Sequence, residues 1–185
     1  MVVQQDKPII IWGWDDAGTT VTVSFAGKTV QAVAEANGRW QASLPAMKAD
    51  GKTYAMTVKG TSALSFDNVV IGEVWLGSGQ SNMEWPVRST TNAEAEIAAA
   101  NYPNIRLYLV PKRVLTTPDP DIKASWQVCA SNTVPNNSAV LFFFGRDVHQ
   151  KLKVPVGLIT SAWGGTRIEP WTEPTAFGEV PTLLS

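Results

Sequence analysis

Apolar and polar residues alternate with a period of two in the first third of the sequence. In residues 19–25, valine and phenylalanine side chains fall on one face and hydroxyl groups on the other, which predicts a strand with one buried and one solvated face. Turn residues such as Asn37-Gly38 and Asp50-Gly51 separate four further runs of this kind. The expected strands are 9–14, 19–25, 29–34, 39–44 and 53–58. Because no helical period lies between them, we expect an antiparallel β-sandwich over residues 1–67.

From residue 68 onward the pattern changes to alternating strands and helices. Three apolar, β-branched runs predict buried strands, and two runs between them have helical character. The expected elements are a strand at 69–76, a helix at 91–100, a strand at 104–110, a helix at 138–152 and a strand at 156–161. This order predicts a second, α/β domain over residues 68–185.

Composition and charge narrow the classes of function. The chain has 185 residues, of which 44% are hydrophobic, enough for a substantial core. Its net charge of −1 provides no attraction for nucleic acid or an anionic membrane, so we expect neither partner. No apolar run reaches the roughly 18 residues that span a bilayer, and the amino terminus lacks the pattern of a signal peptide. The single cysteine, Cys129, argues against a cysteine-based metal site, and we expect no metal and no cofactor.

Eight tryptophans suit either a large sandwich core or a surface that stacks on sugars. Trp12 and Trp14 are two residues apart on one expected strand, so they share a face. We expect both to be buried, as we do Trp40, rather than to form a sugar-binding surface.

The strand at 69–76 ends in small residues that deliver a serine. Residues 77–79, Gly-Ser-Gly, permit a sharp turn, and Ser81 follows it. A serine presented at the carboxyl end of a parallel strand is a common nucleophile. The alternative is a helix cap, because Ser81 and Glu84 have the spacing of a capping box, although Pro86 argues against a continuing helix. Ser81 is therefore our candidate nucleophile.

Two long blocks of sequence, residues 72–86 (GEVWLGSGQSNMEWP) and residues 154–171 (VPVGLITSAWGGTRIEPW), follow each other along the chain. They resemble the nucleophile block and the glycine block of the sialate O-acetylesterase family, a branch of the SGNH hydrolases. Upstream, residues 7–14 and 37–41 resemble parts of the β-sandwich that precedes the esterase domain in this family. The resemblance implies an α/β flavodoxin-like SGNH hydrolase domain, incomplete in this chain, preceded by an all-β sandwich domain. It also implies a secreted or periplasmic location.

The activity that the resemblance implies is that of a serine carboxylic-ester hydrolase. Its substrate would be an acetylated sugar, with acetylated sialate as the first expectation and acetylxylan as the alternative. A non-catalytic carbohydrate-binding module is the alternative from another class. By resemblance, the N–H groups of Ser81 and of Gly165 or Gly164 form two arms of an oxyanion hole.

Three further residues are candidates for contact with the substrate: Gln80, Trp85 and Arg167. Arg167 would either attract a sialate carboxylate or, as a surface residue, pair with Glu169 or Glu173.

The sequence lacks an obvious base for Ser81. Its one histidine, His149, lies on an expected helix, and Asp147 points to a different face of that helix. In the family, the histidine belongs to an Asp-x-x-His-like block near the carboxyl terminus, which residues 1–185 do not contain. We therefore expect a fragment that is completed by a second polypeptide. Following the family's fold, we expect the strand at 69–76 to lie between the other two, in the order 2-1-3.

Overall fold

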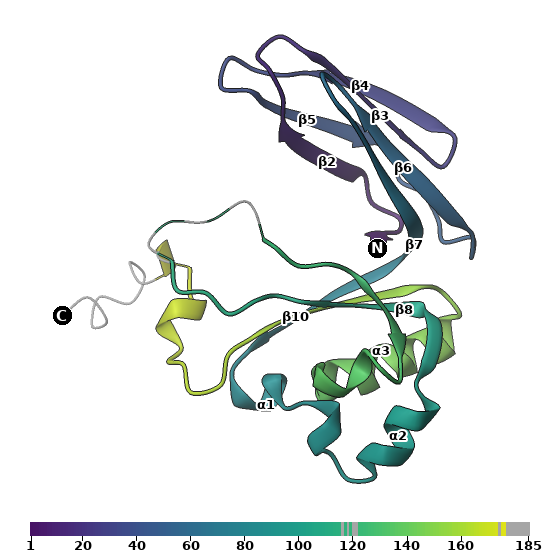
Figure 1. Ribbon diagram of the computed structural model, residues 1–185, viewed down its shortest axis with the longest axis vertical. Coiled ribbons are helices and arrows are strands. Elements are labelled where there is room, and N and C mark those ends of the chain that lie inside the picture. Colours follow the sequence, from purple (N-terminus) through teal and green to yellow (C-terminus); the bar gives the residue numbers. More distant parts are fainter. Residues whose placement is uncertain (116, 118, 120–121, 174, 177–185) are drawn as a thin grey trace, which may run out of the picture.

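One long strand, β7 (Ala63–Gly79), runs through both halves of the molecule (Figure 1). Its first part pairs with the antiparallel strand β6 (Thr53–Lys59), and its second part pairs in parallel with β10 (Val156–Ala162). The computed structural model describes residues 1–115, 117, 119, 122–173 and 175–176. Because β7 belongs to both sheets, it sets the position of one half relative to the other.

The N-terminal strands form two layers around one hydrophobic core. One layer has the order β4–β3–β6–β7, with β1 pairing in parallel with β7, and the other is the antiparallel pair β2–β5. The bounds are β1 (Val2–Gln4), β2 (Ile9–Trp14), β3 (Thr20–Phe25), β4 (Lys28–Val33) and β5 (Arg39–Leu44). The five predicted strands are confirmed to within one residue. Strand β1 was not predicted, because three residues are too few to show a period.

The orientation of β2 differs from the prediction. Trp40 is buried as expected, but Trp12 and Trp14 are 48% and 55% exposed, so the prediction of their burial is wrong. The reason is that the backbone of Gly13 packs against the Trp40 ring. A β carbon added to Gly13 would be 3.0 Å from Trp40 Cζ2. This face of β2, which includes the buried Ile9, is turned toward the core. The two tryptophans therefore face outward.

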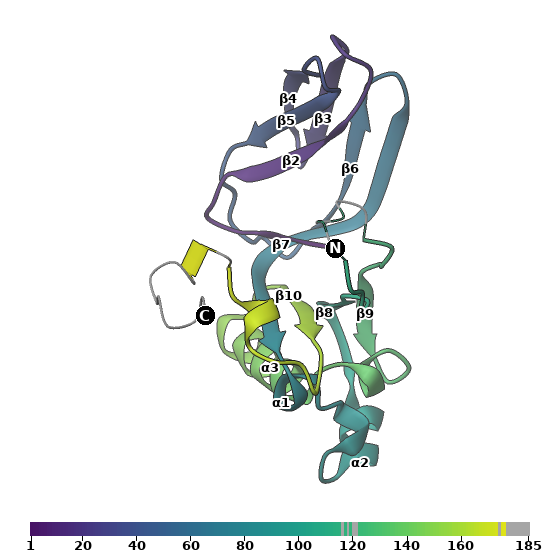
Figure 2. The ribbon, with the colours of Figure 1, turned by 90° about the vertical axis from the view of Figure 1, so that its left-hand side faces the viewer.

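The C-terminal half is a mixed α/β sheet with strand order β7–β10–β8–β9. Strands β8 (Asn101–Leu109) and β10 are parallel to β7, and the short β9 (Gln127–Ala130) is antiparallel to β8. Three helices, α1 (Ser81–Glu84), α2 (Ala93–Ala99) and α3 (Ala139–Leu152), lie on the side away from the N-terminal strands (Figures 1 and 2). Short 3-10 turns occur at Val87–Ser89, Val134–Asn136 and Glu169–Trp171.

The predicted 2-1-3 order is wrong, because β10 rather than β7 lies between the other two parallel strands. After β7 the chain returns two positions away as β8, and β10 later fills the place between them. Both orders keep β7 and β10 adjacent, so the expected meeting of the two family-like blocks is unaffected. None of the described helices is long and apolar enough to cross a membrane.

The passage of β7 from one sheet to the other leaves no space for a side chain at Gly72. A β carbon there would lie 2.0 Å from the carbonyl oxygen of Pro155. We expect Gly72→Ala to lower the free energy of unfolding by about 1–3 kcal/mol or more, as in other overpacked sites, measured by urea denaturation. The exposed Ser65→Ala on the same strand should change it by less than about 0.5 kcal/mol. Equal stability of the two variants would contradict the close approach.

Candidate active site

Ser81 lies at the first turn after β7, as the first residue of α1. Its side chain is exposed, and its hydroxyl forms no hydrogen bond with another described residue. The N-cap of α1 is Gln80, and no side chain caps this helix. Helix α1 ends at Glu84, before the extended Pro86, which cannot continue it. The structure therefore does not contain the capping box that was the alternative for Ser81.

Close packing beneath α1 sets the height of Ser81 above the sheet. A β carbon at Gly77 would lie 2.9 Å from both Leu141 Cδ2 and Met83 Sδ. Met83 belongs to α1 and Leu141 to α3, so both helices rest directly on the β7 backbone. A larger residue at position 77 would push α1, which carries Ser81, away from β7.

The glycine turn after β10 reaches Ser81. Trp163 donates its N–H to the Gly79 carbonyl over 2.9 Å, which holds the end of β10 against the end of β7. A β carbon added to Gly164 would lie 3.5 Å from Ser81 Cβ, so the turn and the serine are in contact. Gly165 has φ +79°, a left-handed conformation that glycine adopts without strain. The two family-like blocks therefore meet at one place.

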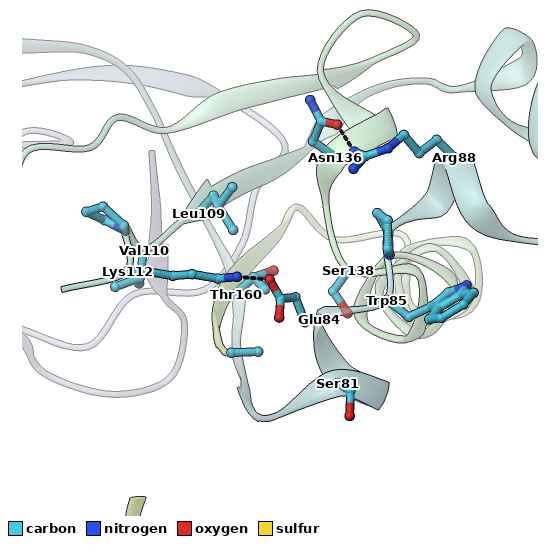
Figure 3. Close-up of a pocket in the computed structure, with 13 residues that line it drawn as sticks. Ser81, Glu84, Trp85, Arg88, Leu109, Val110, Lys112, Asn136, Ser138 and Thr160 are labelled. Atoms are coloured by element: carbon cyan, nitrogen blue, oxygen red, sulfur yellow. Dashed lines mark hydrogen bonds and ion pairs between the residues drawn. The ribbon is translucent and has the colours of Figure 1, made fainter. Parts of the chain in front are cut away.

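Glu84 connects these parts. Gly164 donates its N–H to Glu84 Oε2. Lys112 Nζ forms an ion pair with Glu84 Oε1 (Figure 3). These contacts lower the pKa of Glu84, with the Lys112 hydrogen bond as the larger cause and the Gly164 N–H as the second. Lys112 also lies 5.7 Å above the centre of the Trp163 ring. Glu84 was considered in the sequence only as a partner in a cap.

A hollow of about 700 Å³ opens beside Ser81 (Figure 3). Such a volume is typical of small-molecule sites. Trp85, 54% exposed, lines it and donates its indole N–H to the Ser89 carbonyl over 3.0 Å. Two cations, Arg88 and Lys112, also line it, and Arg88 Nη1 donates to Asn136 Oδ1.

The other two residues predicted to contact the substrate lie outside the lining of the hollow. Gln80 and Arg167 are exposed, and neither lines this hollow. Arg167 forms no ion pair with any described residue, including the expected partners Glu169 and Glu173. The cations at the hollow come from segments that the sequence pattern did not single out, because neither belongs to a local motif.

No histidine lies beside Ser81. His149, the one histidine of the sequence, shares a hydrogen bond of 2.7 Å between its Nδ1 and the Val154 carbonyl. Ser138, at the start of the same helix, α3, lines the hollow. His149 follows it by eleven residues, so the two residues are about 16 Å apart along the helix axis at 1.5 Å per residue. Within the described part of the chain, no three His, Cys, Asp or Glu residues are grouped to hold a metal ion.

Ser138, which lines the hollow, is the N-cap of α3. Its hydroxyl accepts the Leu141 N–H over 3.2 Å, and it is 2% exposed. We expect Ser138→Ala to lower the free energy of unfolding by about 1 kcal/mol, because a helix N–H loses its acceptor. Ser138→Thr, which keeps the acceptor, should lose less. Thermal unfolding of both variants measures the difference, and equal loss would show that capping is not the cause.

Comparison with known proteins identifies the family. Residues 71–180 match the family model described as carbohydrate esterase, sialic acid-specific acetylesterase. The chain is 33% identical over 192 residues to the sialate O-acetylesterase of Mus musculus and 35% identical over 200 residues to that of Rattus norvegicus. These alignments cover 93% and 96% of the chain but 36% of each relative, so the chain spans about a third of their length.

A solved structure has the same fold. The crystal structure of a carbohydrate acetylesterase from Xanthomonas citri is similar with a TM-score of 0.91 and 34% sequence identity. The match covers 97% of this chain and 42% of that one.

Proposed function

The chain belongs to the family of sialic acid-specific carbohydrate acetylesterases, and we propose that it carries the nucleophile of a carbohydrate O-acetylesterase. The observation that supports this most directly is the contact between the exposed Ser81 and the Gly164–Gly165 turn at the carboxyl ends of β7 and β10. Acetylated sialate is the first candidate substrate, and acetylxylan is the second.

In the proposed reaction, Ser81 Oγ attacks the carbonyl carbon of the acetyl ester and gives its proton to a base. The carbonyl oxygen becomes an oxyanion, which accepts hydrogen bonds from the N–H groups of Ser81 and Gly165. The intermediate collapses, the sugar oxygen leaves with the proton, and the acetyl group stays on Ser81. Water then attacks the acetyl-serine with help from the same base, releasing acetate and restoring the hydroxyl.

We propose that the catalytic histidine and aspartate belong to a part of an SGNH-type esterase domain outside residues 1–185, which together with these residues forms the assembled enzyme. An unassisted serine hydroxyl is a poor nucleophile, and His149 is held on α3 away from Ser81. Residues 1–67 would be a β-sandwich accessory domain, residues 68–185 the first part of the esterase domain, and the assembled protein secreted or periplasmic.

The free edge of β7 is the proposed docking site for that part of the esterase domain. Backbone groups of a strand point alternately to its two edges, and those of Glu73 and Gly79 bond to the β10 side. The groups of Val74, Leu76 and Ser78 therefore face the other edge. On that edge Val74 donates its N–H to the Gln4 side chain, and no described strand pairs there with residues 73–79, whose opposite edge pairs with β10.

The surface next to this edge is apolar. Leu76 is 65% exposed, and Trp75 and Phe144, whose rings contact edge to face at 4.9 Å, are 42% and 41% exposed. A strand added here in parallel would bury these side chains and supply the missing backbone partners. Its carboxyl end would then lie beside Ser81, where a base is needed.

A carbohydrate-binding role without catalysis is the second candidate. It is favoured by the exposed pair Trp12 and Trp14, whose rings are 5.4 Å apart and able to contact a sugar face. An organophosphonate probe distinguishes the two functions, because it labels only an activated serine.

We expect Ser81→Ala to reduce acetate release from acetylated sialate by at least about 10³-fold in the assembled enzyme, because the nucleophile is lost. It should also abolish organophosphonate labelling. The exposed Ser89→Ala serves as the control and should retain both. Undiminished acetate release by Ser81→Ala would exclude Ser81 as the nucleophile, and release from acetylxylan alone would exclude the sialate assignment.

We expect Leu76→Lys to weaken association with the rest of the esterase domain about 100-fold, because docking would bury an unpaired charge. The rest of the esterase domain, produced as a separate polypeptide, serves as the titrant in calorimetry. Val33→Lys, a change at a 59% exposed position on β4, is the matched control and should bind normally. If both variants bind as the unchanged chain does, the partner docks elsewhere.

A further inference from the structure

We infer that Glu84 is a positioning residue that joins the helix of the nucleophile to the glycine turn and leaves Gly165 to bind the oxyanion. This inference rests on the proposed function of Ser81. It concerns how that residue is held, and it names the amide that remains free.

Three segments that are distant in sequence meet at the Glu84 carboxylate. Glu84 lies on α1 with Ser81, Gly164 follows β10, and Lys112 follows β8. Each carboxylate oxygen has its own partner, Gly164 N–H on one and Lys112 Nζ on the other. One side chain therefore ties together the segments that follow three strands at the carboxyl edge of the sheet.

Helix α1 needs such a tie. It has four residues, and helices this short are not stable by themselves in water. No side chain caps its N-terminus, and no residue within it is buried. The position of Ser81 is therefore set by contacts of its neighbours, which are Met83 packing over Gly77 and Glu84 bonding to Gly164.

The same contact selects among the amide donors. The Gly164 N–H is already donated to Glu84, so it is not available to an oxyanion. Gly165 N–H forms no hydrogen bond with a described residue, and a β carbon at Gly165 would meet no atom within 4 Å. Gly165 and Ser81 are thus the open donors at the point where the two blocks meet.

Lys112 offsets the negative charge of Glu84 next to Ser81. A negative charge near a developing oxyanion would raise the barrier of the reaction. The ion pair with Lys112 balances that charge, and Lys112 is itself held over the Trp163 ring. Arg88 is the other charged side chain that lines the hollow.

The contact can be tested directly on the chain by NMR. The Gly164 amide proton should shift as Glu84 takes up a proton, with a midpoint below the ordinary carboxyl pKa of 4.5, since its partners lower that pKa. The stabilisation from this contact is present above pH 4.5 and is lost as the pH falls through the lowered pKa. The shift should vanish in Glu84→Gln and persist in Glu94→Gln, an exposed control on α2.

Kinetics of the assembled enzyme separate positioning from general stability. We expect Glu84→Ala to lower kcat about 100-fold with little change in KM, the effect of a displaced reacting group. Glu84→Gln, which keeps an acceptor for Gly164, should recover part of this loss, and Glu94→Gln should match the unchanged enzyme. Unaltered kcat in Glu84→Ala would overturn the positioning role, and so would an equal loss in Gln and Ala. If Ser81→Ala retains activity, the failure lies instead with the proposed nucleophile.

Discussion

The in-register pairing of β7 with β10 is the constraint on which the candidate site depends. The two strands are parallel, with Glu73 opposite Val156 at one end and Gly79 opposite Ala162 at the other. Because they end at the same level, the turns that follow them start side by side. One turn carries Ser81 and the other carries Gly164 and Gly165. A shift of the register by two residues would move these groups about 7 Å apart.

Close packing against β7 and β10 fixes the positions of helices α1 and α3. Gly77 allows side chains of α1 and α3 to touch the backbone of β7. Gly145 allows the backbone of α3 to lie against the Leu158 side chain of β10, where an added β carbon would be 2.6 Å from Leu158 Cδ1. Helix α3 thus rests on both strands, and its capped first turn forms part of the wall of the hollow. The serine is exposed to solvent, but Met83 and Leu141 pack closely against Gly77 below its helix.

On one side of the candidate site the residues are held by contacts within the chain, and on the other side the edge of β7 is exposed. Helix α1, which carries Ser81, is joined to the glycine turn and to Lys112 through Glu84, by contacts within the described chain. Toward the free edge of β7, by contrast, Leu76 and Trp75 are exposed and the backbone groups of the strand lack a neighbouring strand among the described residues. A base delivered along that edge would meet the proposed nucleophile, Ser81, whose helix is already held in place.

The sequence by itself determined the longer strands, the helices α2 and α3 and the two blocks of the candidate site, because these depend on short-range periodicity and on glycines at turns. The short elements β1, α1 and β9 were not predicted. Three features were decided only by the tertiary structure. The order of the parallel strands depends on which edges pair, and both orders fit the same pattern. The outward orientation of Trp12 and Trp14 follows from the Trp40 ring against Gly13. Lys112 and Glu84 are far apart along the chain, and their contact exists only because the ends of β8 and β7 reach the same edge of the sheet.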